Sequence, residues 1–124
     1  MQESEVYSVI GEEGFRNLVG AFYRRVPQDE VLSPMYPSGD FAGAEQRLRD
    51  FLIFRFGGPE KYVEERGHPR LRMRHAPFPV DQAAREHWLQ LMNQSLSEAA
   101  IPEEVKDILR AYFESTAAAM VNRG

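Results

Sequence analysis

Apolar residues recur along most of this chain at intervals of three and four, the spacing of one face of an amphipathic helix. Four segments show the pattern: residues 15–26, 41–56, 82–97 and 103–121. No strand pattern competes with them, so the sequence predicts an all-α protein. The inward-facing positions of the four segments, in order, are Phe15, Leu18, Val19, Phe22, Tyr23 and Val26; Phe41, Ala44, Leu48, Phe51 and Leu52; Ala84, His87, Trp88, Leu91, Ser95 and Leu96; and Val105, Ile108, Leu109, Tyr112, Phe113, Thr116, Ala117, Met120 and Val121.

Residues that favour helix ends bound these segments. Asp40 and Asp81 stand where an N-cap is expected, since a short polar side chain there accepts a hydrogen bond from the first turn. Pro102 suits the first helical position of the last segment, and the two acids that follow it suit the positive end of the helix dipole. Pro27 should end the first segment, and the Gly-Gly-Pro run at 57–59 should end the second.

Shorter stretches separate the long helices. Residues 4–10 predict one or two helical turns, which Gly11 and Gly14 should interrupt. A short helical piece is expected over residues 29–35, and the YPSG sequence at 36–39 predicts a turn.

Residues 60–79 show no apolar periodicity and contain three prolines. Irregular stretches of about 20 residues are uncommon in compact domains and are usually functional or disordered. Within this stretch, Arg66–Phe78 carries four arginines and no acidic residue, although the whole chain has a net charge of −4. Duplex binding would need a more extensive basic face, so we expect no nucleic-acid binding and instead a small dianion as the partner of this segment.

Composition narrows the chemistry further. The chain has 124 residues, the length of one domain, and no cysteine, which excludes disulfides and thiolate-ligated metals. A metal would therefore be held by histidine, a carboxylate or a cofactor. No apolar run is long enough to cross a bilayer, so we expect no membrane insertion. The first residues do not read as a secretory signal, and we expect a cytoplasmic protein.

His75 is the candidate axial ligand of a haem iron. Such a histidine must be neutral and oriented by a hydrogen bond from its other ring nitrogen. Pro77 biases the residue before it away from helical geometry, so His75 would lie near the end of a short turn, where backbone carbonyls are free to accept that bond. Guanidinium groups suit the two haem propionates. The residues placed to assist are Arg70, Arg72 and Arg74, with Tyr62 and His68 as further donors.

Other interpretations of the same residues stay open at this level. A single loop histidine is more often a surface residue than a ligand, and an arginine cluster is most often a solvated patch. His68 and His75 are poor joint ligands for a bare metal, because Pro69 lies between them and no carboxylate accompanies them at ligand spacing. Tyr23 and Trp88, taken alone, are ordinary core aromatics at helical spacing.

Three stretches of the chain carry a family resemblance. They are GGPEKYVEERGHPRLRMRHAPF at 57–78, EHWL at 86–89 and FYRRVPQDEVLSPMYP at 22–37. Together they resemble the truncated haemoglobins, specifically the second (O-type) group, over residues 7–122. The resemblance implies one truncated globin domain over residues 1–124, a two-over-two helical sandwich around haem b. It also implies dioxygen, carbon monoxide and nitric oxide as ligands, an unidentified reductase and a homodimer.

The resemblance also implies a role for particular residues. His75 becomes the proximal iron ligand, and Tyr23, Tyr36 and Trp88 become the distal donors that stabilise a bound ligand. The haem-contacting set that it implies, together with the contacts assigned above, is His75, Arg74, Arg72, Arg70, Tyr62, His68, Ala44, Leu48, Phe51, Met73 and Phe78.

Buried donors should slow the release of a diatomic ligand that gains negative charge on binding. Each is worth roughly 1–3 kcal/mol, and about 2.8 kcal/mol expressed in dissociation slows release about a hundredfold. The sequence therefore predicts tight oxygen binding with slow release, and leaves nitric oxide dioxygenase or peroxidase activity open. The alternative is a cofactor-free helical interaction module that binds an acidic partner through Arg66–Arg74.

Three residues depart from the family pattern. Glu12 stands where a glycine is common, Phe56 where a tryptophan is common, and His87 precedes Trp88 where an acidic or small residue is more usual. None is a proposed ligand. His87 alone changes the electrostatics beside a proposed donor.

Overall fold

The computed structural model describes residues 1–36, 39–59 and 80–121. Within these ranges the long elements are α1 (Val6–Arg25), α2 (Phe41–Arg55), α5 (Gln82–Glu98) and α6 (Glu103–Met120), joined by the short 3-10 turns η1 (Glu3–Glu5), η2 (Val26–Gln28) and η3 (Ser33–Met35). No strand occurs in the described part of the chain. The predicted all-α class is confirmed.

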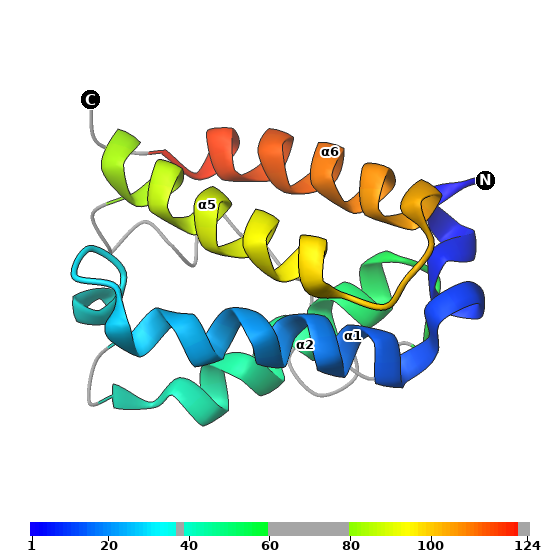
Figure 1. The fold of residues 1–124 in the computed structure, drawn as a ribbon, viewed down its shortest axis with the longest axis horizontal. Helices are drawn as coiled ribbons and strands as arrows, with labels where there is room; N and C mark the ends of the chain where they lie inside the picture. Colours follow the sequence, from blue (N-terminus) through cyan, green and yellow to red (C-terminus); the bar gives the residue numbers. More distant parts are fainter. Residues whose placement is uncertain (37–38, 60–79, 122–124) are drawn as a thin grey trace.

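The helices pack in two pairs (Figure 1). Helix α1 packs on α2 and α5 packs on α6, while α1 also contacts α5 and so joins the pairs. This is the two-over-two arrangement that the sequence predicts. Among the described residues, no helix is both long and apolar enough to span a membrane.

Helix α1 covers both the predicted short helical stretch and the first predicted long helix, with an interruption at Gly11. Gly11 has a φ of 66° and a ψ of −176°, which lie outside helical geometry and which glycine tolerates, so a kink separates two helical parts there, as the sequence predicts. Gly14 does not interrupt the helix, which corrects the prediction. A Cβ at Gly14 would lie 2.6 Å from the Cβ of Ile10, so this glycine instead permits close packing one turn earlier.

The predicted caps of the next two helices are confirmed. The Asp40 carboxylate accepts from the amide of Gly43 at 3.0 Å, and the Asp81 carboxylate accepts from the amide of Ala84 at 2.8 Å. Pro102 is the N-cap of α6 rather than its first helical residue, because its ψ of 145° is extended and helical geometry begins one residue later.

The connection from α1 to α2 also differs from the prediction. The expected helical piece over 29–35 is reduced to η3, since Asp29 has an extended conformation with φ −92° and ψ 120°. After η3, the amide of Gly39 donates to the carbonyl of Tyr36 at 3.1 Å, a hydrogen bond that is consistent with the predicted turn.

The core forms where the inward faces of the four helices meet. The predicted stripes supply most of it, and Met92 is a buried member that the apolar pattern of α5 did not include. Lys106 is also buried, and its Nζ donates to the carbonyl of Ser97 at 3.3 Å, close to the end of α5. Its aliphatic stem therefore packs against apolar neighbours while its charge finds a polar partner.

Residues near the N-terminus hold the end of α2 in place. The amide of Tyr7 donates to the carbonyl of Phe56 at 3.0 Å. Gly57 has a φ of 96°, and a Cβ there would overlap the carbonyl of Ser4. Only glycine meets both conditions, which explains the first glycine of the pair that ends α2.

Candidate functional site

Tyr23 and Tyr36 meet in the interior although they come from different elements. Tyr23 lies on the inward face of α1 and is 8% exposed, while Tyr36 follows η3. Their hydroxyl oxygens are 3.3 Å apart, and their rings pack edge to face with centroids 5.8 Å apart. The 3-10 turns between α1 and α2 thus bring together two of the three predicted donors.

Burial keeps both hydroxyl groups protonated. Burial is the largest cause that raises the pKa of Tyr23, and the adjacent Tyr36 raises it further. Burial also raises the pKa of Tyr36, despite opposing effects of the hydrogen bond with Tyr23 and of the Arg47 charge. Two neutral hydroxyls carry two protons but share one hydrogen bond. Neither has another hydrogen-bond partner among the described residues, so one O–H group remains able to donate.

Trp88 reaches the same aromatic cluster from α5. Its ring lies 5.1 Å from that of Phe22, which in turn packs edge to face on Tyr23 at 5.0 Å. The indole N–H has no hydrogen-bond partner in the part of the chain that the structure describes. Trp88 is therefore one ring removed from the tyrosine pair and offers a second uncommitted donor.

Helix α2 contributes an apolar face to the site. Ala44 and Phe51 are 6% and 7% exposed, and Leu48 is partly buried against the same core cluster. None of these side chains carries a donor. Polar stabilisation of a ligand would thus come from α1, α5 and the turn that ends at Tyr36.

The remaining predicted site residues lie outside the described residues. They are His75, Arg70, Arg72, Arg74, Tyr62, His68, Met73 and Phe78. The proximal ligand and the propionate contacts therefore stay predictions from the sequence. Among the described residues, no group of three or more histidines and acids is placed to hold a metal ion.

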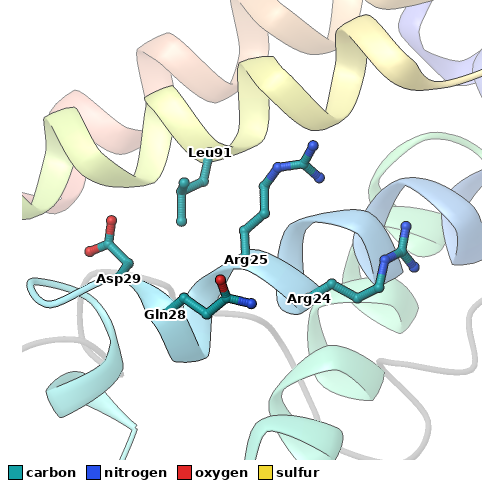
Figure 2. A pocket seen from close by; sticks show the side chains of 5 residues that line it. All are labelled: Arg24, Arg25, Gln28, Asp29 and Leu91. Atoms are coloured by element: carbon teal, nitrogen blue, oxygen red, sulfur yellow. The ribbon is translucent and has the colours of Figure 1, made fainter.

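A surface hollow of about 250 Å³ lies elsewhere, between the end of α1 and α5 (Figure 2). Its lining is mainly charged and polar: Arg24, Arg25, Gln28, Asp29 and Leu91. Arg25 is already paired with Glu98. A flat apolar cofactor would not suit such walls, and this hollow is distinct from the aromatic cluster.

Asp29 is a residue beside the site that no pattern in the sequence indicates. Its carboxylate contacts the Nδ1 atom of His87 at 2.9 Å, across 58 positions of sequence. The unusual histidine beside Trp88 was the available signal. Its partner could not be found from spacing, because no local pattern links residues so far apart.

The described residues fit the distal side of a haem pocket. They provide an apolar wall from α2, aromatic rings from α1 and α5, and uncommitted O–H and N–H donors inside an otherwise apolar cluster. A free O–H or N–H donor beside apolar side chains is stabilised when something accepts its hydrogen bond. A small ligand with a partly negative atom would do so.

Alkaline pH should destabilise the fold through Tyr23. Its folded pKa is raised above the ordinary value of 10.0, so this group contributes stability that is complete below about pH 10 and is lost as pH rises further. Chemical denaturation from pH 8 to 12 should show a steeper loss of unfolding free energy in the native chain than in Tyr23→Phe. Equal slopes would show that Tyr23 ionises as easily in the folded protein as in the unfolded one.

A two-over-two helical sandwich with aromatic hydroxyl donors in an apolar interior defines a globin-type ligand pocket. A family model described as bacterial-like globin matches residues 5–122. The group 2 truncated hemoglobin YjbI of Bacillus subtilis is 38% identical over 117 residues, covering 94% of this chain and 88% of that protein.

Solved structures agree with this match. The hemoglobin of the thermophilic phototrophic bacterium Chloroflexus aurantiacus is 45% identical with a TM-score of 0.91, covering 95% of this chain and 98% of that one. The truncated oxygen-avid haemoglobin from Bacillus subtilis is 38% identical with a TM-score of 0.89, covering 94% and 98% of the two chains. The chain belongs to the bacterial-like globins, as a group 2 truncated haemoglobin. The resemblance seen in the sequence is confirmed, and haem-based oxygen binding follows from it.

Proposed function

We propose that this globin binds dioxygen tightly and releases it slowly. The observation that carries the proposal is the Tyr23–Tyr36 contact, in which the neutral hydroxyls of a buried and a partly buried tyrosine, 3.3 Å apart, retain one uncommitted proton. A donor held in place before the ligand arrives costs little reorganisation, and in an apolar surrounding its hydrogen bond to developing negative charge is strong. Similarity to an oxygen-avid haemoglobin from Bacillus subtilis supports the same conclusion.

The two sides of the pocket would have different tasks. The haem, proposed to be haem b, would supply a ferrous iron that binds dioxygen, carbon monoxide or nitric oxide. His75 would hold the iron from the proximal side, and arginines 70, 72 and 74 would pair with the propionates. Tyr23, Tyr36 and Trp88 would donate on the distal side, where Ala44 offers no competing group.

Further parts of the proposal rest on the sequence alone. They are a separate reductase as the electron source, a homodimeric assembly, a cytoplasmic location, and turnover of nitric oxide or peroxide as an activity beyond binding. Slow oxygen release favours chemistry on the bound ligand over carriage between compartments, because a carrier must unload its ligand quickly.

Purified protein should show a Soret band that shifts when carbon monoxide is added to the reduced form. Stopped-flow displacement of dioxygen by carbon monoxide should then give slow release, and mixing the oxygenated protein with nitric oxide and a reductant should reveal any turnover. A colourless chain that is unchanged by added haemin would contradict the proposal and would favour an interaction module based on Arg66–Arg74. Rapid oxygen release would contradict the donor role.

A further inference from the structure

We infer that His87 and Asp29 form a tether that positions the Tyr36 hydroxyl for its contact with Tyr23 and with the ligand. The inference rests on the proposed donor function of the distal tyrosines. His87 lies on α5, whereas Asp29 lies between η2 and η3. Their contact links the α5 layer to the segment that carries Tyr36.

The contact between the two side chains is close and double. The Nδ1 atom of His87 lies 2.9 Å from one carboxylate oxygen of Asp29 and 3.1 Å from the other. Figure 2 shows Asp29 extending from the turn toward α5, on the other side of Leu91 from Arg25. Burial alone would raise the pKa of Asp29, but the hydrogen bonds from His87 and from the amides of Leu32 and Val31 outweigh it and lower the pKa. The acceptor thus stays ionised at neutral pH.

Asp29 also organises the turn that leads to Tyr36. One of its carboxylate oxygens accepts from the amides of Val31 and Leu32 at 3.0 and 2.8 Å, and its carbonyl accepts from the amide of Ser33 at 2.9 Å. The amide of Tyr36 then donates to the carbonyl of Ser33 at 3.2 Å. A continuous series of hydrogen bonds therefore runs from α5 through Asp29 to Tyr36.

A small displacement of Tyr36 would weaken its hydrogen bond with Tyr23. The Tyr23 and Tyr36 oxygens are 3.3 Å apart, already beyond the usual O–H···O range, and such a bond weakens steeply with further separation or misalignment. His87 is also the residue before Trp88, so one turn of α5 holds both a distal donor and the anchor of another. The tether would fix the relative positions of donors from three separate elements.

Because the pair lies near the surface, its effect on the position of Tyr36 can be distinguished from an effect on the stability of the fold. The side chains of His87 and Asp29 are 33% and 13% exposed, and pairs near the surface contribute little to the free energy of unfolding. The effect of breaking the tether should therefore appear in ligand release more than in folding.

The test compares His87→Leu with the native chain in the haem-loaded protein. Dioxygen release should become about three- to tenfold faster, the factor expected for weakening one hydrogen bond. Carbon monoxide gains less negative charge on binding, so its release should change by less than about twofold. As a readout independent of ligand binding, the amides of Leu32, Ser33 and Tyr36 should exchange hydrogen faster in His87→Leu. Glu98→Ala is the matched control, because it removes another contact of α5, with Arg25, and should leave release unchanged.

A double-mutant cycle with Tyr36→Phe tests whether His87 affects oxygen release through the Tyr36 hydroxyl. If His87 acts through the Tyr36 hydroxyl, His87→Leu should not speed oxygen release further in the Tyr36→Phe background. An equal effect in both backgrounds would overturn the inference, and so would an unchanged rate in His87→Leu when Tyr36→Phe alone speeds release. Failure of Tyr36→Phe itself to change the rate would instead refute the proposed donor function.

Discussion

Replacing Tyr23 by phenylalanine should speed dioxygen release by about 10- to 100-fold, the range expected for loss of a buried hydrogen bond to a charged acceptor. The substitution removes only the hydroxyl. The ring would keep its edge-to-face contacts with Phe22 and Tyr36, so the packing of α1 should be preserved. Stopped-flow replacement of dioxygen by carbon monoxide measures the change directly.

The chain offers a matched control for this substitution. Tyr112 is also a partly buried tyrosine among aromatic rings, but it packs on Phe56 and Phe113, away from the tyrosine pair. Tyr112→Phe should therefore leave oxygen release unchanged.

Two further variants complete the comparison. In Tyr23→Phe the Tyr36 hydroxyl loses its partner and is free to donate, so the double variant Tyr23→Phe/Tyr36→Phe should release oxygen faster still. Trp88→Phe should also speed release, because it removes the uncommitted indole N–H. Unaltered rates in the double variant and in Trp88→Phe would remove the donor argument altogether.

Replacing His75 by alanine should abolish the native bond between the protein and the haem iron. Loss of an outer-shell partner of a metal ligand costs about 10- to 100-fold in affinity, so loss of the ligand itself should cost more. The Soret and visible spectra should change accordingly, and added imidazole should restore them in part because it supplies the missing nitrogen.

His68→Ala is the control for that experiment. It removes a histidine from the same segment, seven positions earlier, that is predicted to contact the haem propionates and not the iron, so the spectral bands that report iron ligation should be preserved. An unchanged spectrum in His75→Ala would show that the iron is held by another residue. A changed spectrum in His68→Ala with a normal one in His75→Ala would move the assignment to His68.

The sequence by itself determined the helices and the family. An apolar stripe and a capping aspartate act within a few residues, through main-chain hydrogen bonds and burial of one face, so they can be read locally. The inward faces of α2 and α6 and the caps at Asp40 and Asp81 followed from such signals. The sequence also supplied His75 as the proposed ligand.

The sequence did not show which of two glycines would interrupt the first helix. Gly11 bends α1 and Gly14 does not, although both look alike in the sequence. Their surroundings differ: a Cβ at Gly14 would lie 2.6 Å from the Cβ of Ile10, whereas a Cβ at Gly11 would meet no described atom within 4 Å. Propensity indicates that a break is allowed, and packing decides whether it occurs.

Only the tertiary structure decided how the donors are arranged. Tyr23 and Tyr36 are 13 positions apart, and their hydroxyls meet because two short 3-10 turns fold the chain back over α1. His87 and Asp29 are 58 positions apart and meet because α5 packs on α1. Such contacts depend on where whole helices lie against one another, which side-chain spacing along the chain does not record. The sequence named the three proposed donors, and the packing of the helices brought two of them into contact and placed His87 against Asp29.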